Sequence, residues 1–120
     1  MIDSNLDREK AVLHVHPTGP LREEDFNDLA NIVDPFIEET GNLTGLIIET
    51  THFPGWEDLG AAARHFRFVR DHHKKIKKVA VVTDSPIGNA VEHIASHFLS
   101  AQIKHFPAGH LEQAKLWIIS

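Results

Sequence analysis

Residues 50–73 read TTHFPGWEDLGAAARHFRFVRDHH, and the rest of the chain is arranged around this stretch. It follows residues 46–48 (LII), which are apolar in succession, as in a strand that is buried on both faces. A turn at Pro54-Gly55 then leads into a run with helical periodicity, and residues 79–82 (VAVV) predict a second buried strand. A strand, a helix and a strand in this order predict a right-handed unit with parallel strands.

Strands and helices continue to alternate on both sides of this unit. Residues 1–6 predict a short edge strand, residues 11–16 alternate with the period of a strand, and residues 26–37 carry a helical apolar stripe. Gly41 is expected to cap the helix over residues 26–37 at its C-terminal end. Residues 87–98 predict another helix. A short strand and a last helix, with Leu111, Ala114 and Ile118 on its inward side, complete the chain. We therefore expect one α/β domain over residues 1–120, with a mostly parallel sheet of four to five strands and about four helices.

The second helix carries two stripes on roughly opposite sides. Leu59, Ala62, Ala63 and Phe66 form the more apolar stripe, which we expect to face the sheet. The other stripe consists of Ala61, His65, Phe68 and His72. Among core residues we expect Ile47, Val81, Phe66 and Ile94 to be nearly fully buried. Phe68 is expected to be at least half covered, either by a second subunit or by the aromatic turn at residues 53–56.

The composition is that of an ordinary soluble domain, with 42% hydrophobic and 24% charged residues. A net charge of −5 argues against a nucleic-acid partner, and the run from Lys74 to Lys78 is interpreted as a solvated helix end. Cysteine is absent, which excludes disulfides and thiolate chemistry. The sequence shows no signal-peptide pattern and no apolar run of the roughly 18 residues that a membrane span needs, so we expect a cytoplasmic protein without an integral membrane segment.

No complete catalytic or metal-binding motif is found in the sequence. His14 and His16 share one strand face, and His93 and His97 share one helix face, but each pair supplies only half of a metal site. Ser85 lacks the Gly-x-Ser-x-Gly context of a hydrolase nucleophile. We therefore expect no bound metal, no cofactor and no enzyme activity.

Aromatic and histidine side chains gather around the turn and the second helix, where an α/β sheet presents its binding sites. This candidate ligand or partner surface consists of His52, Phe53, Trp56, His65, Phe68 and His72. The first interpretation is a non-enzymatic module that binds an apolar or lipid-like small molecule, or a protein partner. One alternative is a small hydrolase or isomerase that uses His52, His65 or Asp58. Another is a homodimeric regulatory protein that pairs through the second helix.

Several segments resemble the SpoIIAA-like proteins of the STAS/SEC14 group: residues 19–25 (GPLREED), 53–60 (FPGWEDLG), 66–73 (FRFVRDHH), 76–82 (IKKVAVV), 105–106 (HF) and 114–117 (AKLW). The resemblance implies a βα superhelix and a bacterial cytoplasmic protein with no assigned enzyme activity. SEC14-like relatives hold lipids, and anti-sigma factor antagonists carry a phosphorylatable serine where the second helix begins. Residues 54–59 (PGWEDL) contain no serine, and Thr50 and Thr51 lie upstream, so we expect no phosphorylation switch.

Overall fold

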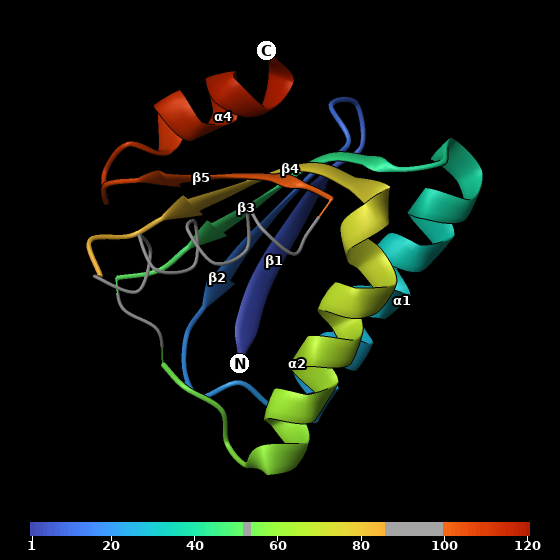
Figure 1. Cartoon of the computed structure of the whole chain (residues 1–120), viewed down its shortest axis with the longest axis vertical. Coiled ribbons are helices and arrows are strands. Elements are labelled where there is room, and N and C mark those ends of the chain that lie inside the picture. The colour runs from blue at the N-terminus through green and yellow to red at the C-terminus, as the bar shows by residue number, and fades with distance from the viewer. Residues whose placement is uncertain (52–53, 86–99) are drawn as a thin grey trace.

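The computed structural model describes residues 1–51, 54–85 and 100–120 (Figure 1). Its centre is a five-stranded sheet in the order β1-β2-β3-β4-β5. The strands are β1 (Ile2–Asp7), β2 (Val12–Pro17), β3 (Leu43–Glu49), β4 (Ile76–Val82) and β5 (Gln102–Phe106). β1 is antiparallel to β2, whereas the other three pairings are parallel.

The sheet is therefore mixed, and the expectation of a mostly parallel sheet holds only from β2 to β5. β1 and β2 are joined by a tight turn, in which Asp7 Oδ1 accepts hydrogen bonds from the backbone N–H groups of Glu9 and Lys10. A connection this short can only join antiparallel neighbours, because a parallel pair needs a crossover of a dozen or more residues.

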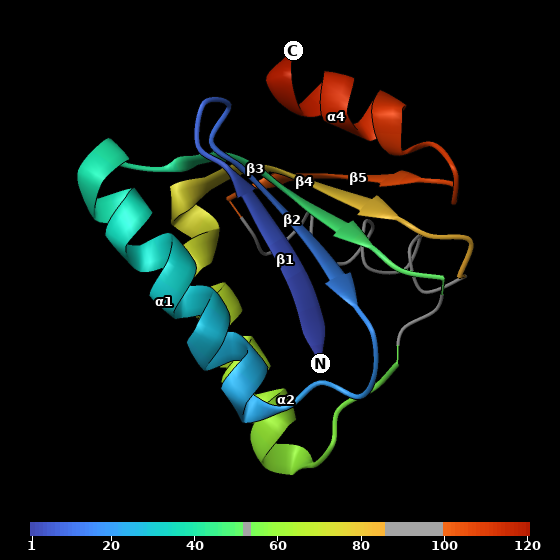
Figure 2. The same ribbon diagram turned by 180° about the vertical axis from the view of Figure 1, so that it is seen from behind.

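Three α-helices and one short 3-10 helix lie in the described part of the chain, fewer than the four or so helices expected. They are α1 (Glu23–Thr40), α2 (Leu59–His72), η1 (His73–Lys75) and α4 (Leu111–Ile119). The helix expected over residues 87–98 lies outside the described residues. Seen from behind in Figure 2, α1 and α2 lie side by side on one side of the sheet, and α4 covers the opposite face.

The sheet separates two hydrophobic clusters. On one face, Leu13 and Val15 of β2 pack with α1 and with Phe68 of α2. On the other face, Ile47 of β3 packs with Ala114 and Ile118 of α4. Ile47 and Val81 are 1% and 6% exposed, which confirms their predicted burial.

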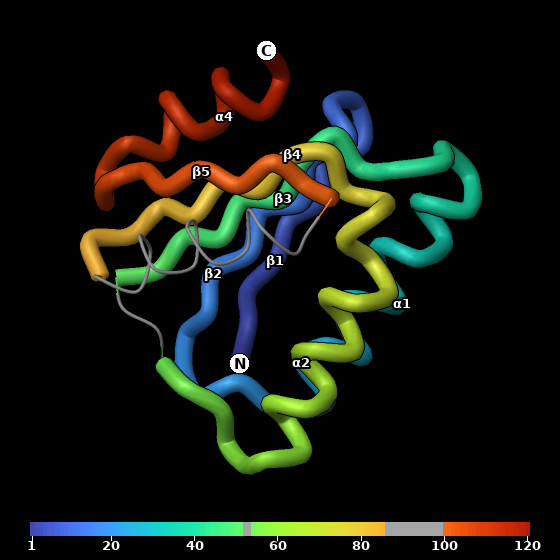
Figure 3. Tube along the Cα trace, in the orientation of Figure 1, coloured from blue at the N-terminus to red at the C-terminus, as the bar shows by residue number. Residues whose placement is uncertain are grey.

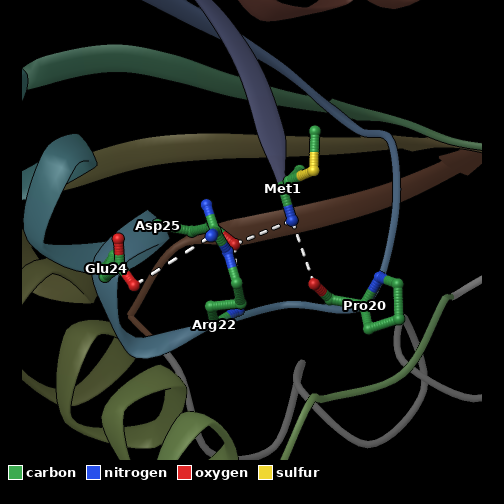
Figure 4. Close-up of polar contacts among 5 residues, drawn as sticks. All are labelled: Met1, Pro20, Arg22, Glu24 and Asp25. Atoms are coloured by element: carbon green, nitrogen blue, oxygen red, sulfur yellow. Dashed lines mark hydrogen bonds and ion pairs between the residues drawn. The ribbon is translucent and has the colours of Figure 1, made fainter.

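α1 is held at both ends by polar contacts. The Asp25 carboxylate accepts a hydrogen bond from the backbone N–H of Arg22 and lies 2.9 Å from the amino group of Met1, which also donates to the Pro20 carbonyl (Figure 4). Burial opposes ionisation of Asp25, but these contacts outweigh it and lower the pKa of Asp25 below its ordinary value. At the other end, Gly41 adopts φ 95° and its N–H closes the helix onto Ile37, as predicted.

The predicted orientation of α2 is wrong. Phe66 is 68% exposed and Leu59 is 89% exposed, whereas Phe68 is 8% exposed and His72 is buried. The predicted burial of Phe68 is met within the chain itself, because α1 covers it rather than a second subunit or the aromatic turn. The predicted burial of Ile94 concerns a position outside the described residues.

Candidate functional site

The loop before α2 is tied to the segment that leads into α1. Leu21 donates its N–H to the Gly55 carbonyl at 2.8 Å, and its carbonyl accepts from the N–H of Glu57 at 2.8 Å. The Asp58 carboxylate then caps α2 by accepting from the N–H of Ala61 at 2.8 Å. These bonds fix Trp56, between Gly55 and Glu57, beside the first turns of α2.

His65 belongs to the contact between α2 and α1. Its ring stacks on Phe26 of α1 with centroids 4.8 Å apart, and its Nδ1 accepts a hydrogen bond of 3.1 Å from the indole Nε1 of Trp56. Burial lowers the pKa of His65 below its ordinary value, since the charged ring is poorly solvated there. The neutral ring thus ties Trp56, α2 and α1 together.

His72 makes the second polar contact between the two helices. Its Nδ1 donates to the Phe68 carbonyl at 2.7 Å, its Nε2 lies 2.6 Å from Asp34 Oδ1, and its ring stacks on Phe68. Nearer the helix starts, Arg64 Nε donates to Asn27 Oδ1 at 2.9 Å. Asn27 lies opposite Arg64 and Asp34 opposite His72, so α1 and α2 run parallel, as the trace in Figure 3 shows.

The other side of α2 carries what we call the outer stripe: Leu59, Ala63, Phe66 and Arg70. All four are exposed, and Trp56, at 39% exposure, lies beside Phe66 with ring centroids 6.3 Å apart. Arg70 Nε donates to Asp71 at 3.0 Å, and this contact lowers the pKa of Asp71. An apolar patch next to arginines is thus presented on the surface of α2.

The structure divides the predicted surface between the two sides of the helix. Phe68 and His72 face α1, His65 and Trp56 join the two sides, and His52 and Phe53 lie outside the described residues.

Sequence reasoning missed Leu59 and Phe66 as surface residues, because both stripes of α2 have spacings that fit one face of a helix. The sequence feature that could have revealed the true orientation of α2 is the presence of two histidines, His65 and His72, in the stripe with Phe68. Histidine rings can be buried when partners satisfy their nitrogen atoms, as Asp34 and Trp56 do here.

Two of the three residues assigned to the enzyme alternative have structural partners, and the third, His52, lies outside the described residues. Asp58 caps α2, and His65 is engaged with Trp56 and Phe26. His14 Nε2 lies 3.0 Å from Glu49 Oε1, with both side chains partly exposed. Among the described residues, no group of three or more histidine, aspartate or glutamate side chains is arranged to hold a metal ion.

Two hollows in the surface are lined mostly by polar and charged residues. One, of about 780 Å³, lies between α1 and α2 and includes Asp34, Arg64 and His72. The other, of about 460 Å³, includes Lys74 and Lys77 at the start of β4. Neither is lined mainly by the hydrophobic and aromatic side chains that are typical of a site for an apolar small molecule. No helix in the described ranges is long and apolar enough to cross a membrane.

Comparison with known proteins finds one family and a structural neighbour. The model of the family described as SpoIIAA-like matches residues 12–119. A crystal structure of an uncharacterized protein from Shewanella loihica with a SpoIIAA-like fold superimposes with a TM-score of 0.78. The two chains are 21% identical, and the match covers 98% of this chain and 93% of the other, so this likeness establishes the fold alone. No curated protein matches the sequence significantly.

Proposed function

Because the chain belongs to the SpoIIAA-like family, which gives it a fold and no assigned chemistry, we propose that it is a non-enzymatic module that binds a protein partner. The outer stripe of α2 and Trp56 form the contact surface. The observation that carries the proposal is the exposure of Leu59 and Phe66, at 89% and 68%, on a helix whose other side contacts α1. Large apolar side chains grouped on one exposed helix face are characteristic of surfaces that bind proteins.

The composition of the stripe resembles that of binding hot spots. Trp56 and Arg70 belong to the residue types that dominate measured binding energies, and Phe66 adds a large apolar area. Trp56 is held in place by its hydrogen bond to His65, so little side-chain entropy is lost when a partner covers it. The surface is therefore ordered before binding.

A protein partner is favoured over an apolar small molecule by the shape of this surface. The exposed residues project from the convex side of a helix, whereas small ligands are bound in enclosed hollows. The two hollows described above have charged and amide side chains in their walls. The partner surface thus extends along a helix face, as in other helix-mediated protein contacts.

Site-directed photo-crosslinking in living cells tests this proposal. A benzophenone amino acid at position 66 should form covalent adducts with a defined protein, identified by mass spectrometry of the crosslinked peptides. The same probe at Leu116 of α4, which is 65% exposed, serves as the matched control and should not form that adduct. Equal crosslinking from both positions, or none from position 66, would contradict the proposal.

A further inference from the structure

We propose that the partner of the outer stripe is a second copy of this chain, in a symmetric dimer whose two α2 helices lie antiparallel. This inference rests on the proposed function, because it names the partner of the same surface. Leu59, Ala63, Phe66 and Arg70 follow one another at intervals of four, three and four residues. Helices that pack along a shared seam use this spacing, because it keeps the contact residues on one line.

The apolar part of the stripe is complementary to itself. Leu59 and Phe66 are bulky and lie on either side of Ala63, whose small side chain allows a close approach of two helices. In an antiparallel pair centred near Ala63, Leu59 of each copy lies against Phe66 of the other. The two-fold axis generates this contact twice, so each copy covers its patch with the same patch of the other copy and neither patch stays exposed.

Charge complementarity selects the antiparallel arrangement. Glu57 and Asp58 stand just before α2, whereas seven of the twelve lysines and arginines, and only one of the seventeen acidic residues, lie within residues 59–78. An antiparallel pair places Glu57 of one copy near Arg67 and Arg70 of the other. A parallel pair would bring the two basic ends together and align the two helix dipoles unfavourably.

The dimer needs no rearrangement of the chain. The inner side of α2 stays on α1 through His65, Phe68 and His72, and only exposed side chains become covered. Trp56 lies at the edge of the contact, where the centring on Ala63 places its indole close to Arg70 of the other copy. This pair offers a cation–π contact at each end of the seam.

Sedimentation velocity of the purified full chain, from about 1 µM to about 1 mM, tests the inference across the usual range of dimer affinities. The wild-type chain should form dimers, and Phe66→Asp should be monomeric with an unchanged circular dichroism spectrum. Leu116→Asp on α4 is the matched control and should remain dimeric. A wild-type chain that is monomeric throughout, or a Phe66→Asp variant that still forms dimers, would overturn the inference.

Charge reversal tests the orientation. We expect the single variants Glu57→Arg and Arg67→Glu each to weaken the affinity of the dimer at least about tenfold. The affinity of the double variant should return to within about threefold of wild type, because opposite charges again face each other across the two-fold axis. Double-variant affinity no better than that of the single variants would overturn the antiparallel arrangement.

If the purified chain is monomeric but position 66 crosslinks in cells to a different protein, the dimer is wrong and the proposed function stands. If position 66 crosslinks to nothing, both fail.

Discussion

Replacing Phe68 with alanine should lower the free energy of unfolding by about 3–5 kcal/mol, the range for deleting a buried aromatic ring. Phe68 is 8% exposed, and its ring lies between Phe26 of α1, at 6.0 Å between centroids, and His72, at 4.1 Å. A buried aromatic side chain removes roughly 150–250 Å² from water, and the cavity left behind adds to the lost transfer energy. Because a domain is stable by only about 5–15 kcal/mol, the loss is a large share of the total.

Phe66 provides the matched control on the same helix. It is 68% exposed, so Phe66→Ala should change the stability of the monomer by less than about 0.5 kcal/mol. Urea unfolding followed by circular dichroism measures both variants, at a protein concentration low enough to keep the chain monomeric. If Phe68→Ala does not fold, Phe68→Leu keeps most of the volume and should cost less than about 1.5 kcal/mol. Equal losses for Phe66→Ala and Phe68→Ala would refute the orientation of α2.

Three further changes follow from contacts of single residues. Burial lowers the pKa of His65 in the folded chain below its ordinary value of 6.5. The stability that the neutral ring contributes is therefore complete above that ordinary pKa and is lost as the pH falls through the folded pKa. Urea unfolding at several pH values should show this loss of stability, and the loss should be smaller in the His65→Gln variant. Asp34→Ala removes the partner of His72 Nε2 and should cost about 1–3 kcal/mol in urea unfolding, whereas Glu38→Ala on the same helix should cost less than about 0.5 kcal/mol. Gly45→Ala would push a Cβ into the side chain of Ile118 and should cost about 1–3 kcal/mol; combining it with Ile118→Ala, which removes the overlapping atoms, should cost less than the sum of the two single changes, and strict additivity would contradict the overlap.

The order of elements could be predicted from local patterns, because each pattern has a direct structural cause. The uninterrupted apolar runs around Ile47 and Val81 predicted buried strands, and both residues are buried. Gly41 predicted the end of α1, since only a residue without a Cβ adopts its φ of 95° at no cost. Ala114 and Ile118 predicted the inward side of α4, and both pack against β3 and its neighbours.

The orientation of α2 could not be predicted in this way, because hydrophobicity alone does not record how a polar side chain is paired. His72 is buried since Asp34, distant in sequence, and the Phe68 carbonyl satisfy its ring nitrogens. When the two stripes are compared by hydrophobicity alone, the stripe with Leu59 and Phe66 is the more apolar one and is therefore expected in the core. The same error misplaced two of the six residues of the predicted surface, since Phe68 and His72 were assigned to the outside.

α2 has its closest packing with α1 and with η1 at its own end. A helix held mainly by one neighbour can detach as a cooperative unit while the sheet and α4 stay folded, and amide hydrogen exchange would register this as a separate, lower opening energy for residues 59–72. Because the outer stripe is carried on this helix, the partner that we propose would bind only the attached form, and its apparent affinity would scale with the fraction of molecules in that form. Substitutions at Phe26 or Asp34, which lie on α1 and outside the outer stripe, would therefore change the proposed binding from a distance.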